Sequence, residues 1–323
     1  MKRLLLPAVV LASAALVLAA AKPPAEVFLD PDAAGPDFAL QGEYVGETAG
    51  RDKLAAQVVA EGDGKFTAYF LAGGLPGDGW DGKAKVKAAA RTADGKTTFD
   101  GAGWKGEIAD GKLTGTHEDG AAFRLNHVVR VSPREGAKPP DGAIVLFDGT
   151  SVDEWKNGKI VGEHLLAQAA TTKRTFRDFT LHVEFRLPFK PKARGQERCN
   201  SGVYLQRRYE IQILDSFGLA GDKSECGAVY EQTPPAVNMC YPPLSWQTYD
   251  IDFRAACWGA DGKKTADAVV TVVHNGVKVH DKQDIPTKTG YGDKEADTPG
   301  PINLQDHGNP VVFRNAWVVE RKE

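Results

Sequence analysis

His307 is the residue whose type and sequence surroundings best suit proton transfer. It lies between Asp306 and Gly308, directly before a strand expected over 311–319, so a loop can aim its imidazole into a cleft. An imidazole titrates near neutral pH, as a general base should. The alternative is a histidine that caps a turn through local hydrogen bonds. The neighbouring Asp306 is a candidate to bind substrate.

Polar side chains alternate with aliphatic ones in three expected strands. Glu210 and Gln212 alternate with isoleucines, Tyr204 and Gln206 follow the same pattern in the preceding strand, and Glu184 does so further upstream. Because side chains alternate between the two faces of a strand, the aliphatic residues should enter a core and the polar ones should share an outer face. Such a face suits sugar hydroxyls, and Glu210 is a candidate catalytic carboxyl. An ordinary solvated face is the alternative.

A cation or a metal could stabilise negative charge near these groups. Arg208 is the candidate cation, although it could instead be a hairpin-turn residue paired with an acid. Glu184, Glu210 and His307 could together hold a divalent cation such as calcium, manganese or zinc. No HExxH or HxH spacing supports that site. Asp215 is a candidate to bind sugar, but it also fits a plain strand exit.

Composition and missing motifs exclude several other functions. The 323 residues carry 40 Lys and Arg against 43 Asp and Glu, so the basic excess typical of nucleic-acid binding is lacking. No GxSxG nucleophile elbow occurs, and the Gly-rich runs near Gly73 and Gly77 precede no expected helix, which argues against a phosphate loop. With 42% hydrophobic and 26% charged residues the chain should form globular domains.

The N-terminus has the pattern of a secretory signal peptide over residues 1–21. Lys2 and Arg3 precede an apolar stretch over 4–18, and small alanines follow it. A transmembrane anchor is the alternative, but the stretch is short for one. No later apolar run could span a bilayer, so we expect a secreted or periplasmic bacterial protein without a membrane partner after cleavage.

Four cysteines in an oxidising compartment suggest two disulfides, with three connectivities open. We favour Cys226–Cys240, because that bond would close a Pro-rich loop and stabilise the protein by about 3 kcal/mol. Cys199–Cys257 would then remain. A zinc site made of all four thiolates lacks any CxxC pair.

Turn signals predict two all-β domains. Asp-Gly pairs, which favour two-residue hairpin turns, recur at Asp63, Asp81, Asp94, Asp110 and Asp119 and predict a small antiparallel domain over 27–131. The polar, Pro-rich segment 132–142 is the expected linker. Short strands then continue over 143–321, including a hairpin with an Asn-Gly turn, and predict two packed antiparallel sheets.

Five segments of the second domain are distinctive. Beginning at Ile144, Asn200, Cys226, Trp246 and Gly300, they read IVLFDGT, NSGVYLQRRYEIQILDS, CGAVYEQ, WQTYDIDF and GPINLQDHGNPVVFRN. In this order they resemble the 3-keto-disaccharide hydrolase family, also described as 3-keto-glucoside lyase/hydratase. The resemblance covers about residues 143–321. It implies a concanavalin A-like jelly-roll β-sandwich, exported by a bacterium, that acts on 3-keto-sugars.

The chemistry implied by this resemblance is elimination. A ketone at carbon 3 acidifies the proton on carbon 2, so a base can remove it and expel the group on carbon 1. His307 is then the candidate base, and no pair of carboxylates at fixed separation is needed. Two alternatives stay open, because the fold also serves other roles. They are a non-catalytic carbohydrate-binding module and a structural domain of an exported assembly.

Overall fold

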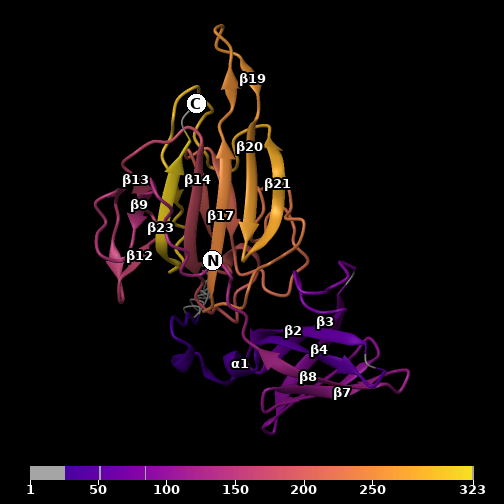
Figure 1. The fold of residues 1–323 in the computed structure, drawn as a ribbon. Helices are drawn as coiled ribbons and strands as arrows, with labels where there is room; N and C mark the ends of the chain where they lie inside the picture. The colour runs from indigo at the N-terminus through magenta and orange to yellow at the C-terminus, as the bar shows by residue number, and fades with distance from the viewer. Residues whose placement is uncertain (1–25, 51, 84, 322–323) are drawn as a thin grey trace, which may run out of the picture.

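The computed structural model describes residues 26–50, 52–83 and 85–321 and consists almost entirely of strands (Figure 1). The expected signal peptide lies outside these residues. The helical segments of the described part are η1 (Pro31–Ala33), α1 (Gly35–Leu40) and η2 (Gly195–Glu197). None of its helices has the length and apolar character needed to traverse a bilayer. The all-β class predicted from the sequence is confirmed.

The first eight strands close into an antiparallel barrel, in which β1 pairs with both β2 and β8. Their bounds are β1 (Gly42–Thr48), β2 (Lys53–Gly62), β3 (Lys65–Ala72), β4 (Val86–Ala93), β5 (Lys96–Gly101), β6 (Trp104–Ala109), β7 (Lys112–His117) and β8 (Ala122–Val128). Asp63, Asp94 and Asp110 adopt φ of 55°, 51° and 48° in two-residue turns, as predicted. Asp81 and Asp119 lie in wider loops, where each carboxylate accepts from the backbone N–H two residues later.

The following strands form a sandwich of two antiparallel sheets. The smaller sheet has the order β10 (Trp155–Lys156), β13 (Thr171–Thr172), β22 (Asn303–Leu304), β15 (Ser201–Leu205), β16 (Tyr209–Ile213). The larger has the order β11 (Ile160–Val161), β12 (Leu165–Ala167), β23 (Val312–Glu320), β14 (Phe179–Arg186), β17 (Trp246–Arg254), β20 (Ala268–His274), β21 (Val277–Ile285), with β9 (Ile144–Phe147) also on β23. A separate hairpin joins β18 (Cys257–Trp258) to β19 (Lys264–Ala266).

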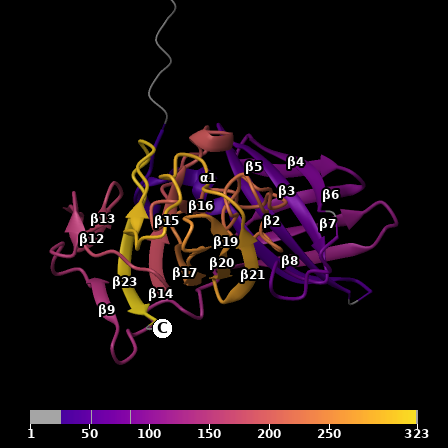
Figure 2. The same cartoon turned by 90° about the horizontal axis from the view of Figure 1, so that it is seen from above.

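The barrel packs against one end of the sandwich (Figures 1 and 2). Val59 and Tyr69 point outward from the barrel wall and belong to the buried core of the sandwich. Lys85 crosses the same boundary, because its Nζ donates to Gln57 Oε1 in the barrel at 2.9 Å and to the Gly218 carbonyl in the sandwich at 3.1 Å. Burial lowers the pKa of Lys85 to about 8. Shared apolar core and a buried amine therefore fix the two parts together.

The linker segment lies on the outer face of the larger sheet. Arg134 donates to both carboxylate oxygens of Asp250, at 3.1 and 3.0 Å, and the N–H of Gly136 donates to Glu184 at 2.5 Å. Burial alone would raise the pKa of Glu184, but hydrogen bonds from its neighbours, His182 foremost, lower it to about 2. The linker therefore forms a strap that covers this face.

His182 lies beneath the strap and is fully buried. Its ring stacks on Trp317 at 5.1 Å, and its Nδ1 is 2.9 Å from Asp250 Oδ1. Burial opposes protonation of His182, but hydrogen bonds to Asp250 and Glu184 outweigh it and raise the pKa. An imidazole held between two carboxylates thus supports the strap.

The four cysteines are free thiols, so neither predicted disulfide is formed in this structure. Cys199 is buried and donates to the Pro188 carbonyl at 3.0 Å, whereas Cys257 lies on β18, in a hairpin outside both sandwich sheets. Cys226 and Cys240 are neighbours, since each thiol affects the pKa of the other. Loop length predicted their proximity but could not predict their oxidation state.

We expect the strap to make stability depend on pH through His182. Because the pKa of His182 is higher in the folded than in the unfolded state, protonation of His182 stabilises the fold. This stabilisation is complete below the unfolded pKa of about 6.5 and is lost as pH rises through the folded pKa. His182→Phe should keep the stacking on Trp317 but remove that pH-dependent loss, measured by urea unfolding from pH 5 to 9. His164→Asn, at an exposed histidine with positive φ, is the control and should behave as wild type. An unchanged pH profile in His182→Phe would contradict this account.

Candidate active site

A row of polar residues crosses the outer face of the smaller sheet. Strand pairing places Thr171 opposite Asn303, Asn303 opposite Tyr204, and Tyr204 opposite Glu210. Directly opposed residues have Cβ atoms about 5 Å apart and point to the same face. The aliphatic residues between them, such as Ile211, lie in the sandwich core. The alternation predicted from the sequence therefore places Tyr204 and Glu210 together.

A cavity of about 450 Å³ lies above this row. His307 and Asp306 contribute to it from the loop between β22 and β23. Gln305 comes from the same loop, and the other lining residues are Ala169, Tyr204, Arg207, Tyr291 and Asn303. The structure thus brings His307, Asp306 and Tyr204 to one cavity, with Glu210 beside Tyr204.

Glu210 is a buried carboxyl with a raised pKa. Only 2% of the residue is exposed, and no cation of the described chain forms an ion pair with it. Burial raises its pKa to about 7, and the nearby Tyr204 hydroxyl acts in the opposite direction. Gly202 makes room for the side chain, because a Cβ there would lie 2.2 Å from Glu210 Oε1. The group can therefore hold or release a proton near neutral pH.

The hydroxyl of Tyr204 is buried and makes no hydrogen bond of normal distance and angle with the described chain. Glu210 and the backbone N–H of Tyr291 are nevertheless near enough to affect its pKa, which burial raises well above the usual range. A buried polar atom without a well-formed partner costs free energy unless something else satisfies it. Because Tyr204 lines the cavity, a bound ligand can do so.

His307 and Asp306 are exposed at the rim of this cavity. Asp306 Oδ1 accepts from the N–H of Gly308 at 2.8 Å, and Asn309 Nδ2 donates to the His307 carbonyl at 3.2 Å. Lys190 in turn donates to Asn309 at 2.7 Å, which fixes the loop to the sandwich. The ring of His307 hydrogen-bonds to no described residue, so it is free to meet a ligand.

The arginine predicted from the sequence, Arg208, does not line the cavity, whereas its neighbour does. Arg208 is buried and donates to Gln206 Oε1 and to the Thr298 carbonyl, at 2.8 and 2.9 Å. Its neighbour Arg207 lines the cavity and pairs with Asp293 at 3.2 Å. The two-residue turn falls at Gln206 and Arg207, with φ of 54° and 55°, one position earlier than expected. The pairing of β15 with β16 is therefore shifted by one residue from the pairing that a turn at Arg207 and Arg208 would give.

Three other predicted sugar-binding residues make internal contacts instead. Gln206 has left the strand and donates to the Phe176 carbonyl at 2.9 Å. Gln212 lies on the expected face, but its amide donates to Gln196 at 3.1 Å under a neighbouring loop. Asp215 is buried in an ion pair with Arg198 at 2.8 Å. None of them lines the cavity.

Glu184 lies on the outer face of the other sheet, beneath the strap, with Arg314 at 2.7 Å. Glu184 and Glu210 both point away from the core, but their two sheets present opposite faces. The metal set of Glu184, Glu210 and His307 is therefore not assembled. Among residues 26–50, 52–83 and 85–321, no cluster of three or more His, Cys, Asp or Glu could hold a metal ion.

The sequence analysis missed Arg207, Tyr291, Asn303 and Gln305. Asn303 and Gln305 alternate with aliphatic residues directly before Asp306, so the period-2 rule could have found them. Tyr291 is 86% exposed in a glycine-containing loop with no regular pattern. An aromatic ring at this position offers a stacking surface for a sugar, which no sequence signal indicated.

Comparisons with known proteins identify the family of the sandwich domain. A model of the 3-keto-alpha-glucoside-1,2-lyase-like domain matches residues 142–319. A crystal structure from Parabacteroides distasonis, of a candidate glycosyl hydrolase, is 31% identical, with a TM-score of 0.51, covering 56% of this chain and 85% of the other. A second candidate glycosyl hydrolase from that organism is 17% identical, with a TM-score of 0.42, covering 56% and 95%. No curated protein matches the chain.

The chain belongs to the 3-keto-alpha-glucoside-1,2-lyase-like family, because the family model matches more than half of it. It is a carbohydrate-active enzyme of the glycoside hydrolase or lyase type. The family assignment made from the sequence is confirmed. The barrel lies outside the matched region.

We expect Glu210→Gln to stabilise the protein in alkaline solution. Because the Glu210 carboxyl has a pKa of about 7 in the folded state and 4.5 ordinarily, its ionisation disfavours the folded state. The protonated group therefore contributes its full stability below pH 4.5, and this contribution is lost as pH rises through 7. Above that pH the variant should gain about 3 kcal/mol over wild type, and near pH 4 the gain should vanish. Thermal and urea unfolding across pH 4 to 9 measure this difference. Glu107→Gln, at an exposed glutamate of β6, is the control; an equal shift in both variants would contradict the prediction.

Proposed function

We propose that this enzyme cleaves 3-keto-glycosides by base-promoted β-elimination, followed by hydration of the product. The observation that supports this most is the pair of Tyr204 and Glu210 beneath the cavity that His307 overlooks. The pair supplies a proton-transfer group near neutral pH at the site where a sugar would bind. Elimination next to a ketone does not require the two carboxylates at fixed separation that ordinary glycosidases use.

In the first step His307 removes the proton on carbon 2. The electron pair of the C2–H bond passes through the enolate of the carbon-3 ketone and then forms the C1–C2 double bond as the C1–O bond breaks. Arg207 lines the same cavity and is placed to stabilise the enolate oxygen. Tyr204 donates its hydroxyl proton to the departing oxygen, and Glu210, protonated below its pKa of about 7, returns a proton to Tyr204.

Hydration reverses the proton movements. A water molecule attacks carbon 1 of the unsaturated ketone while Tyr204, now backed by the Glu210 carboxylate, accepts its proton. The protonated His307, which is exposed and therefore exchanges its proton with water, returns a proton from the solvent to carbon 2. The sum of both steps is hydrolysis of the glycosidic bond with no net change in the enzyme.

We also propose that the protein is exported through the signal peptide over residues 1–21. The charged start, apolar middle and small residues of this segment support export. N-terminal sequencing of the protein recovered from the periplasm or medium should show that these residues are absent. Recovery of the uncleaved chain from the membrane would contradict it.

The elimination mechanism predicts which substitutions abolish turnover of a chromogenic 3-keto-glucoside. His307→Ala and Tyr204→Phe should each lower kcat/KM by about a hundredfold or more, as is typical when a proton-transfer group is lost. Glu210→Gln should lower kcat and remove the pH dependence near 7. The control His164→Asn, at a histidine outside the cavity, should retain wild-type activity.

Two outcomes would contradict the proposal. Wild-type protein that binds the 3-keto-glucoside without turning it over would be a carbohydrate-binding module. Full activity in His307→Ala would exclude the imidazole as the base. Circular dichroism of each variant confirms that the fold is intact.

A further inference from the structure

A second, larger cavity lies around the sandwich edge from the candidate active site. Its volume is about 770 Å³, within the range of small-molecule sites. Its floor is a row of opposed residues on the outer face of the larger sheet, Ala167 on β12, Val312 on β23 and Arg186 on β14. Leu29 and Leu244 close one end.

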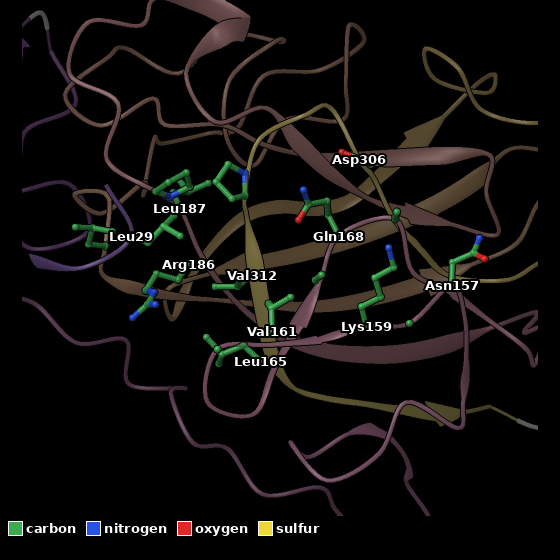
Figure 3. A pocket seen from close by; sticks show the side chains of 17 residues that line it. Leu29, Asn157, Lys159, Val161, Leu165, Gln168, Arg186, Leu187, Asp306 and Val312 are labelled. Carbon is green, nitrogen blue, oxygen red and sulfur yellow. The ribbon is translucent and has the colours of Figure 1, made fainter. Parts of the chain in front are cut away.

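The two cavities meet at Ala169 and Asp306, which line both. These residues lie in the two segments that cross between the sheets, 168–170 and 305–311. The Ala169 N–H donates at 2.9 Å to the carbonyl of Leu304, the residue directly before the second segment. Figure 3 shows Asp306 at the rim of the second cavity, above the apolar floor. A substituent attached to carbon 1 of a sugar bound over Tyr204 can therefore extend across this rim into the second cavity.

The lining of the second cavity is apolar with a cation at each end. Val161, Leu165 and Val312 lie between Lys159 and Arg186 (Figure 3). Neither cation forms an ion pair with a carboxylate in the described part of the chain, and the Arg186 guanidinium lies 5.2 Å from the ring of Trp246. An apolar body with an acidic group complements such a lining, because the body is removed from water and the acid meets an unpaired cation.

We propose that this second cavity binds the aglycone of the substrate and selects 3-keto-glycosides whose aglycone is bulky, apolar and acidic. This inference rests on the proposed function of the neighbouring site. It assigns Val312 and Leu165 to contact the apolar body, and Lys159 to bind the acidic group. The sugar itself stays in the smaller cavity over Tyr204.

The test compares three substrates, the 3-keto-glucosides of methanol, 2-naphthol and 6-hydroxy-2-naphthoic acid. Val312→Trp fills the cavity from its floor and should lower kcat/KM for both naphthyl substrates by about tenfold or more, while the methyl substrate stays within about twofold. Lys159→Gln should lower kcat/KM roughly threefold to fivefold for the acidic substrate alone. For each substrate, the kcat/KM of the variant is divided by that of wild type, because aryl and methyl leaving groups also differ in intrinsic reactivity.

Val145→Trp is the matched control, since Val145 lies on β9, which also pairs with β23, and does not line the cavity. It should leave all three ratios near one. If Val312→Trp leaves the naphthyl substrates unaffected, or lowers all three substrates equally in a protein with wild-type circular dichroism, the proposal is wrong.

Binding of free 6-hydroxy-2-naphthoate, followed by its own fluorescence, separates this inference from the proposed function. Wild type should bind it, and Val312→Trp should lose most of that binding, even in a protein that turns over no 3-keto-glucoside. Inactivity with intact binding would overturn only the proposed function. Absence of binding to wild type would overturn the aglycone site.

Discussion

A carboxyl group buried without a cation beside it is the constraint on which the site depends. Glu210 is kept from water by its own sheet and by the loops that carry Tyr230 and Gly290, so ionisation is disfavoured. Its one nearby side-chain donor is Tyr204, whose hydroxyl is itself left without a well-formed partner. A carboxyl without a cation beside it and a hydroxyl without a well-formed partner thus lie side by side, and the hydroxyl belongs to a residue that lines the cavity. Stability alone would favour a fold in which both groups have full hydrogen-bond partners.

The remainder of the molecule determines which face is open to a ligand. The outer face of the larger sheet is partly occupied by the linker, which Glu184 and Asp250 hold through hydrogen bonds. The barrel covers one end of the sandwich and shares its core with it. What remains accessible is the outer face of the smaller sheet, the part of the larger sheet's outer face around Val312, and the edge between them, where the loop carrying His307 crosses between sheets. The two cavities meet at this edge, so sugar and aglycone can be bound together.

The strand pattern allowed much of the fold and part of the site to be predicted. Period-2 alternation placed Tyr204 and Glu210 on one face correctly, because that rule depends only on the pleat. It failed for Gln206 and Arg208, since both lie in the connection between β15 and β16, where the alternation of a strand no longer applies. It also failed for Glu184, because alternation assigns a face of a strand but not which of two sheets the strand joins. Tyr291 and the barrel closure depend on tertiary packing that no local pattern encodes.

Cleavage in D2O tests the central claim most directly, because elimination breaks the C2–H bond and direct hydrolysis leaves it intact. We predict that the 3-keto-glucose formed by wild-type enzyme carries deuterium at carbon 2, as measured by proton NMR at early times against a sample without enzyme. Product that retains the original hydrogen at carbon 2, formed at the full rate of cleavage, would contradict the account.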